Sequence, residues 1–139
     1  MAEPKTRPTG ASVDDFINSV DHAGRREDGF AVLSMLRDVT GQPAEMWGPS
    51  IVGFGRYPLS YADGSRAEWP RIGFSPRKAN MVLYVLTGDE KEAELLSRLG
   101  KHKTGNSCLY LGRLKDVDQD VLRRLCEHTW SVMDRRYPA

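Results

Sequence analysis

The chain has few of the residues that staple small proteins together. Its 139 residues include two cysteines, Cys108 and Cys126. Two cysteines at this separation form neither a disulfide framework nor a zinc knuckle. Free cysteine is usually a buried apolar side chain, so we predict that both thiols belong to the core. A chain of this length can bury a sufficient hydrophobic core as one domain.

Long hydrophobic runs are also missing. No apolar stretch approaches the about 20 residues that cross a membrane as a helix. The N-terminal segment, MAEPKTRPTG, is polar and lacks the apolar part of a secretory signal. We therefore expect a cytoplasmic protein without a membrane partner. Residues 1–10 are expected to form a flexible tail, and residues 11–139 a single domain.

An excess of charge of one sign is absent as well. The 20 Lys and Arg residues nearly balance the 19 Asp and Glu residues, which leaves a formal net charge of +1. The chain as a whole therefore lacks the strong positive charge typical of nucleic-acid-binding proteins, and we predict no nucleic-acid partner.

The sequence contains no catalytic or metal-binding motif that we recognise. It has no G-x-S-x-G nucleophile elbow. His22, His102 and His128 fall in separate predicted elements, and none has a second ligand at metal-binding spacing. A pair of Cys108 and His102 is conceivable, but Cys108 begins a predicted strand, where a core position is favoured. We predict a non-catalytic domain without a cofactor or a bound metal.

The segment 46–86 is the most informative part of the chain, because apolar and aromatic residues alternate there with turn residues. This pattern is typical of a small antiparallel sheet. Gly53 and Gly55 are unusual inside a strand and indicate a bulge or a close backbone approach. The predicted strands cover 50–57, 66–75 with an interruption at Pro70, and 81–86, and the predicted turns cover 62–65 and 77–80.

Helical patterns flank this sheet on both sides. Ser12 and Asp15 have the spacing of a capping box at the start of a first helix. Further helices are predicted over 27–40 and 89–99, one extra helical turn at 43–47, a last strand over 108–111, and a terminal helix that Asp116 caps. The order of these elements predicts an α+β fold, with helices packed on a small, mainly antiparallel sheet.

The connectivity predicts a basic rim at one end of this sheet. The turn 77–80 lies at the end where the first strand begins. The helix 89–99, about 16 Å long at about 1.5 Å per residue, returns the chain to that end and places the loop 100–107 beside the turn. Trp47 precedes the first strand and offers a flat apolar wall. The predicted ligand-binding residues are Trp47, Arg77, Lys78, Lys101, His102, Lys103 and Thr104.

A concave site with several convergent donors is typical of small anionic ligands. We expect such a ligand, an anion or a carboxylate, to make a bidentate contact with Arg77 while the lysines supply charge. The alternative is that these residues form an ordinary solvated basic surface. The run 100–105 is not a phosphate loop, because it lacks the G-x-x-x-x-G-K-[ST] order and follows a helix.

Three ordered blocks resemble the YdhG-like family of domains of unknown function: MWGPSIVGFGRYPLSYADG, WPRIGFSPRKANMVLYVL and LLSRLGKHKTGNSCLYLGRLKDVD. The resemblance covers roughly residues 14–128. It implies a compact α+β domain of YdhG-like type. The family as a whole has no established reaction.

The resemblance also implies an alternative function, because some family members are described as intracellular iron chaperones with a frataxin-like role. The candidate iron ligands are acidic residues of the first and last helices: Asp14, Asp15, Asp21, Asp116, Asp118 and Asp120. Acidic residues are also common at helix N-termini because of the helix dipole. A further alternative is a protein–protein module in which the aromatic hairpin forms a homodimer.

Overall fold

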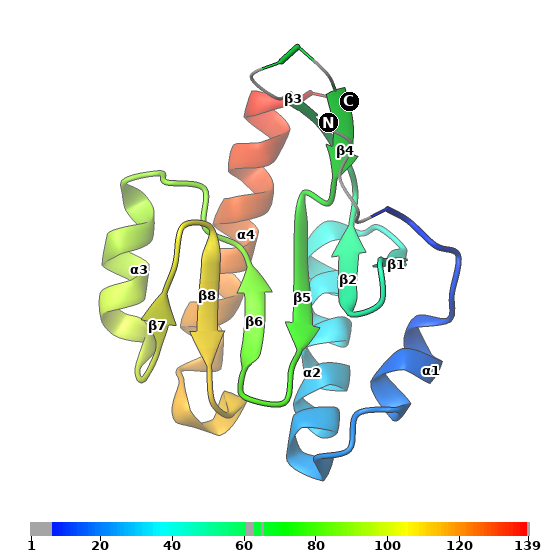
Figure 1. Ribbon diagram of the computed structural model, residues 1–139. Helices are drawn as coiled ribbons and strands as arrows, with labels where there is room; N and C mark the ends of the chain where they lie inside the picture. Colours follow the sequence, from blue (N-terminus) through cyan, green and yellow to red (C-terminus); the bar gives the residue numbers. More distant parts are fainter. Residues whose placement is uncertain (1–6, 61–62, 65, 139) are drawn as a thin grey trace.

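The computed structural model describes residues 7–60, 63–64 and 66–138 (Figure 1). The helices are α1 (Val13–Asn18), α2 (Ala23–Thr40), α3 (Lys91–Leu99), η1 (Leu114–Asp116, a 3-10 helix) and α4 (Gln119–Arg136). The strands are β1 (Ala44–Trp47), β2 (Ile51–Phe54), β3 (Tyr57–Ser60), β4 (Arg66–Trp69), β5 (Ile72–Pro76), β6 (Met81–Tyr84), β7 (Lys103–Thr104) and β8 (Cys108–Leu111).

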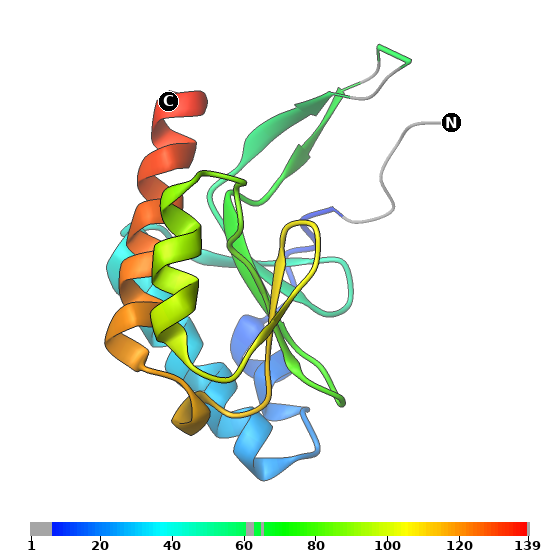
Figure 2. The same cartoon turned by 90° about the vertical axis from the view of Figure 1, so that its left-hand side faces the viewer.

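A six-stranded antiparallel sheet forms the centre of the fold, in the order β1-β2-β5-β6-β8-β7. Strands β3 and β4 form a separate two-stranded hairpin that extends beyond one end of the sheet (Figure 1). Helices α2, α3 and α4 lie on one side of the sheet (Figure 2). The predicted α+β class is confirmed. We call the opposite side of the sheet, which these helices leave uncovered, the open face.

The core lies between the sheet and the helices. The strand register aligns Val52, Phe74, Leu83 and Leu109 in one row across four strands, and each is 0% exposed. Because side chains alternate along a strand, the neighbours of these residues point toward the open face. Because this row of residues packs against the helices, the residues next to them in each strand lie on the open face.

The helix boundaries confirm some of the predicted caps and correct others. Ser12 accepts a hydrogen bond from the N–H of Asp15 at 3.1 Å, as predicted for the start of α1. Helix α2 begins at Ala23 rather than at 27, because Nδ1 of His22 caps it by accepting from the N–H of Arg25 at 3.0 Å. In the described part of the chain, no helix is long and apolar enough to cross a membrane.

The cap predicted for the terminal helix is wrong by two positions. Asp118, not Asp116, accepts hydrogen bonds from the N–H groups of Asp120 and Val121 at the start of α4. Asp116 lies in the preceding 3-10 helix η1 instead. Because both residues suit an N-cap, sequence spacing alone does not choose between them.

Several strands also differ from the prediction. The strand predicted over 50–57 divides into β2 and β3 at Gly55, whose φ of 67° turns the chain. The helical turn predicted over 43–47 is strand β1, and β7 was not predicted. The interruption predicted at Pro70 is confirmed, since it separates β4 from β5. Of the turn predicted over 62–65, residues 62 and 65 lie outside the described residues.

Part of the segment predicted as a flexible tail is bonded to the sheet. The N–H of Thr9 donates to the carbonyl of Met46 at 3.0 Å, and the N–H of Gly48 donates to the carbonyl of Arg7 at 2.8 Å. Residues 7–9 therefore cover the outer edge of β1, which would otherwise expose unpaired backbone groups.

Charged side chains of α2 hold two loops in position, the β5–β6 turn and the loop that follows β8. Arg25, 7% exposed, donates from Nε to the carbonyl of Arg77 at 3.0 Å and from Nη1 to the carbonyl of Gly112. Asp28, also 7% exposed, accepts from Nε of Arg113 at 2.8 Å. Burial lowers the pKa of Arg25, and the negative charge of Asp28 opposes this effect. The backbone of the β5–β6 turn is thus held in one position.

Candidate functional site

The register places two rows of side chains on the open face. One row, across β2, β5, β6 and β8, consists of Gly53, Gly73, Tyr84 and Cys108. The second row, across β5, β6, β8 and β7, consists of Ser75, Val82, Tyr110 and Lys103.

The first row starts with two glycines, and the space above Gly53 is filled by aromatic residues. A Cβ on Gly53 would lie 2.6 Å from both Trp47 Cδ1 and Pro70 Cβ, so only glycine lets the indole lie on the strand. The rings of Trp47 and Trp69 have centroids 6.2 Å apart, and Trp69 meets Tyr84 edge-on at 6.2 Å. Both distances lie in the range of favourable aromatic pairs.

Trp47 is not the exposed wall that the sequence predicted. Its side chain is 0% exposed, because Trp69 and the β2 backbone cover it. Its Nε1 has no hydrogen-bond partner among the described residues. The half-buried residues Trp69 and Tyr84, which the sequence analysis did not select, form the aromatic surface of this face instead.

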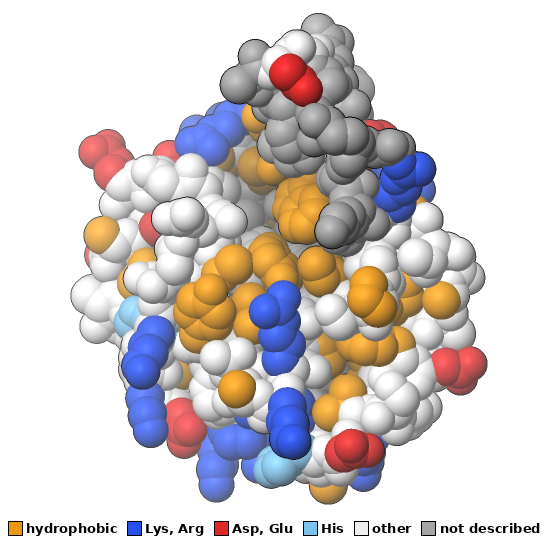
Figure 3. Space-filling model, in the orientation of Figure 1, with side chains coloured by type: hydrophobic (Ala, Val, Ile, Leu, Met, Phe, Trp, Pro, Cys, Tyr) orange, Lys and Arg blue, Asp and Glu red, His pale blue; other side chains and the backbone are white. Residues whose placement is uncertain are grey.

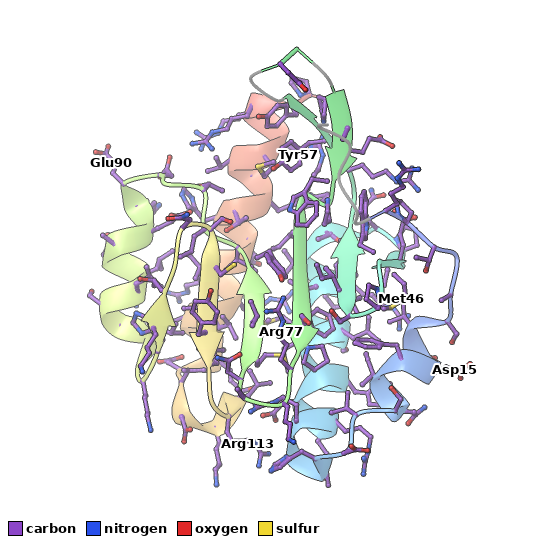
Figure 4. All side chains as sticks on the ribbon, in the orientation of Figure 1. Asp15, Met46, Tyr57, Arg77, Glu90 and Arg113 are labelled. Atoms are coloured by element: carbon purple, nitrogen blue, oxygen red, sulfur yellow. The ribbon has the colours of Figure 1, made fainter. Side chains whose placement is uncertain are left out.

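Arg77 lies over the middle of the open face (Figure 4). Its Nη2 donates to the hydroxyl of Tyr84 at 2.8 Å, and its Nε lies 3.4 Å from Oγ of Ser75. Within the described part of the chain, no carboxylate forms an ion pair with Arg77. Figure 3 shows basic side chains standing among hydrophobic side chains across this face. The predicted site residue Arg77 thus points onto the open face rather than along the rim.

The hydroxyl of Tyr84 serves as a neutral acceptor for Arg77. Burial raises the pKa of Tyr84 above its usual value, while the positive charge of Arg77 acts in the opposite direction. The phenol therefore stays protonated at neutral pH. Ser75 in turn donates from Oγ to the carbonyl of Ser50 at 2.5 Å, which orients its oxygen lone pairs. Tyr84 and Ser75 together hold the guanidinium in place.

The turn 77–80 and the loop 100–107, which were predicted to lie side by side, come together over only part of their length. Asn80 and the residues Lys101, His102 and Lys103 line one cavity of about 230 Å³, which we call the basic cleft. This arrangement brings the turn 77–80 beside the loop, as the connectivity suggested. Lys78 instead lines a different cavity with Phe16.

The end of the predicted loop lies elsewhere. Strand β7 carries the chain back along the sheet, and β8 then returns antiparallel to it. Residues 105–107 therefore lie at the opposite end of β8 from the basic cleft, contrary to the predicted rim (Figure 1). Thr104 pairs with Leu109, which belongs to the row that faces the helices, so it does not line the cleft.

Two residues of the basic cleft are exposed cations, while the third is bonded to its own backbone. Lys101 and Lys103 are exposed, and Lys103 belongs to the same row of the open face as Tyr110. Nδ1 of His102 lies 2.7 Å from the carbonyl of Gly100. Because a carbonyl only accepts, Nδ1 carries the proton in this contact.

A second cavity, which we call the hairpin cavity, lies where β6 ends and the β3–β4 hairpin leaves the sheet. Its volume is about 190 Å³. Four of the residues that line it are aromatic: Tyr57, Trp69, Tyr84 and Tyr137. The others are four apolar residues, Pro70, Val85, Leu86 and Met133, and five polar or charged ones, Arg71, Thr87, Ser107, Thr129 and Arg136.

The acidic residues considered as iron ligands occupy ordinary structural positions. Among the described residues there is no group of three or more His, Cys, Asp and Glu side chains that could hold a metal ion. Asp118 caps α4. Outside this set, Asp89 accepts from Nε2 of His128 at 2.9 Å. Its pKa is lowered mainly by the N–H of Lys91 and then by His128.

Comparison of the chain with protein-family models, with curated proteins and with solved structures gave no match. The resemblance to the YdhG-like family therefore stays a prediction. The functional inferences below rest on the geometry of the open face.

The two cysteines differ in accessibility, which gives a direct test of this geometry. Cys108 is half-buried beside Tyr84, whereas Cys126 is 0% exposed and burial raises its pKa to about 12. Because the thiolate is the reactive form, iodoacetamide at about pH 8 should alkylate only Cys108 in the native protein. Peptide mass spectrometry would show this, and unfolding in urea should make both thiols reactive. Equal native labelling of both would contradict the burial of Cys126 on α4.

Proposed function

We propose that this protein is a small-ligand-binding domain that holds an anionic group, such as a carboxylate or a phosphate, on the open face through Arg77. The observation that supports this proposal most directly is the position of Arg77. Its guanidinium lies on an aromatic face, is oriented by Tyr84, and has no carboxylate partner in the described ranges. The proposal includes no catalytic step.

The guanidinium is suited to this task by chemistry and by position. Arginine presents several N–H donors in a fixed plane, which matches the paired oxygens of a carboxylate or phosphate. The contacts with Tyr84 and Ser75 occupy Nη2 and Nε in part and restrict the rotamer. Less side-chain entropy is then lost when an anion binds.

The backbone below Arg77 supports the same proposal. Its N–H donates to the carbonyl of Asn80 at 2.9 Å, and its own carbonyl accepts from Arg25. The turn is therefore fixed at both backbone groups before any ligand arrives. The exposed lysines of the basic cleft, Lys101 before β7 and Lys103 on β7, add positive potential beside this turn.

Isothermal titration with benzoate, acetate and inorganic phosphate would test this proposal. Hydrogen bonds to a charged group contribute about 1.5–3 kcal/mol, so Arg77→Gln should weaken binding about 10- to 100-fold. Arg77→Lys should give an intermediate loss, since it keeps the charge but not the paired donors.

Lys78→Gln is the matched control for this experiment. Lys78 belongs to the same turn and carries the same charge, but it lines a different cavity. We expect its affinity for the three probes to stay within about twofold of wild type, because distant exposed charges are screened by salt. An equal loss in both variants would show a nonspecific charge effect, and no binding by the wild-type protein would remove the proposal.

A further inference from the structure

We infer that the anion held by Arg77 belongs to a compound that also carries an aromatic ring, and that this ring occupies the hairpin cavity. The anionic half of the inference rests on the proposed function. The ring subsite rests on a separate observation, which is the shape and lining of the hairpin cavity.

The walls of the hairpin cavity are aromatic on several sides. Tyr57 comes from β3, Trp69 from β4 and Tyr84 from β6, while Tyr137 follows α4. The rings of Tyr57 and Tyr137 have centroids 4.9 Å apart. Pockets that combine aromatic walls with polar groups are typical small-molecule sites.

The size of the cavity limits its occupant to a small ring system. Its volume is about 190 Å³. An apolar cavity of about 150 Å³ takes up benzene. The hairpin cavity therefore admits one substituted ring or a small fused pair. Aromatic walls favour an aromatic occupant over an aliphatic one of equal size, by about 0.5–1.5 kcal/mol per ring pair.

The cationic side chains that line this cavity are already bonded to the protein. Arg71 donates to the carboxylate of Asp134 at 2.9 Å and to the carbonyls of Arg56 and Tyr137. Arg136 donates to the carbonyl of Thr87 at 3.1 Å. Arg71 is thus neutralised by a carboxylate, whereas Arg136 is engaged by a backbone carbonyl.

Tyr84 joins the hairpin cavity to the anion contact. Tyr84 is among the residues that line the cavity, and its hydroxyl accepts from Arg77 at 2.8 Å. One residue therefore belongs to both subsites. Figure 4 shows Tyr57 at the hairpin end and Arg77 over the middle of the sheet. An aryl carboxylate, an arylalkanoate or an aryl phosphate carries both a ring and an anionic group, as a ligand of the two subsites must.

Binding should therefore depend on the ring of the probe as well as on its charge. Benzoate and cyclohexanecarboxylate carry the same charge on a ring of similar size. We expect the wild-type protein to bind benzoate about 2- to 10-fold more tightly, from the aromatic contribution alone. Indole-3-acetate should bind at least as well as benzoate, and acetate more weakly than both.

A variant that fills the mouth of the hairpin cavity tests whether the ring of the ligand binds there. Ser107 is exposed and lines the hairpin cavity, so Ser107→Trp should fill its mouth without disturbing the core. The matched control is Asn106→Trp, because Asn106 is exposed in the same turn but does not line the cavity. Ser107→Trp should abolish the preference for benzoate over acetate while leaving acetate binding unchanged. Asn106→Trp should keep the preference, and thermal melts would confirm that both variants are folded.

The outcomes separate the ring subsite from the anion contact. If benzoate and cyclohexanecarboxylate bind equally and both depend on Arg77, the ring subsite is wrong and the proposed function stands. The ring subsite is also wrong if Ser107→Trp keeps the benzoate preference. If neutral indole binds and Ser107→Trp prevents this, but Arg77→Gln leaves benzoate binding unchanged, the anion contact is wrong instead. Absence of binding for every probe overturns both.

Discussion

Replacing Asp28 with alanine is expected to lower the free energy of unfolding by about 1–3 kcal/mol, the usual cost of leaving a buried hydrogen-bond donor without its acceptor. Asp28 is 7% exposed and accepts hydrogen bonds from Nε of Arg113 at 2.8 Å and from the N–H of Leu114 at 3.1 Å. Arg25, one turn earlier on the same helix, is equally buried and would lose the negative charge beside it. Urea unfolding followed by circular dichroism measures the loss.

Asp38→Ala is the matched control on the same helix. The side chain of Asp38 is 70% exposed and lies 3.8 Å from Arg123, so its removal should change stability by less than about 0.5 kcal/mol. Asp28→Asn should fall between the two variants, because it keeps an acceptor for the Leu114 N–H but loses the charge. Similar stabilities for Asp28→Ala and Asp38→Ala would contradict the role assigned to the buried cluster.

Replacement of Asp28 should affect ligand binding as well as stability. Arg25 donates to the carbonyl of Arg77 and thereby fixes the β5–β6 turn. Loss of Asp28 removes the negative charge beside Arg25. We therefore expect Asp28→Asn to weaken binding of benzoate even under conditions in which the variant is fully folded.

Replacing Gly73 with alanine is expected to cost about 3 kcal/mol of stability, the upper end of the usual range for overpacking. A Cβ at this position would lie 2.7 Å from the carbonyl oxygen of Val52. That oxygen belongs to the paired strand β2, and Gly73 itself pairs with Gly53. Relief of the overlap requires β2 and β5 to separate, because no flexible side chain is available to move. Urea unfolding and near-ultraviolet circular dichroism of the tryptophans would record the effect.

Gly112→Ala provides the comparison for this variant. A Cβ on Gly112 would meet only Oδ2 of Asp116, at an ordinary 3.5 Å. We expect stability within about 0.5 kcal/mol of wild type, as for most surface substitutions. If Gly73→Ala proved as stable as Gly112→Ala, the close approach of β2 and β5 on the open face would be wrong.

The elements with strong local signals were predictable from the sequence. Ser12 caps α1, and Gly41 adopts φ 65° after α2, because side-chain capping and positive φ act within a few residues of the chain. Strand β8 begins and ends at the predicted residues. Strand β6 is central, as its apolar run indicated.

The elements without local signals were missed or misassigned. Strand β1 pairs with β2, a strand of equal length, and the two-residue strand β7 pairs with the longer β8. The early start of α2 depends on a histidine cap, and histidine is not among the preferred capping residues. Backbone pairing in two hairpins and one side-chain cap supply the stabilisation in these cases, and no pattern of apolar residues reports it.

Some residues of the candidate site were also predictable from the sequence, and others were not. Sequence reasoning selected Arg77 and the loop residues 101–103, and the structure brings Asn80 of the turn beside that loop. It also selected Trp47, which the fold buries. Trp69 and Tyr84 were not selected for the site, because the direction of each side chain depends on strand register.

The amino-acid sequence by itself determined the α+β class, the principal helices and strands, and the presence of basic residues in two separate turns. Local capping, turn chemistry and the alternation of apolar residues suffice for these features. Only the tertiary structure decided that Arg77 lies across an aromatic sheet face and that four aromatic residues from distant segments enclose one cavity. Strand register and the exit angle of the hairpin set those contacts, and both depend on how the whole chain packs.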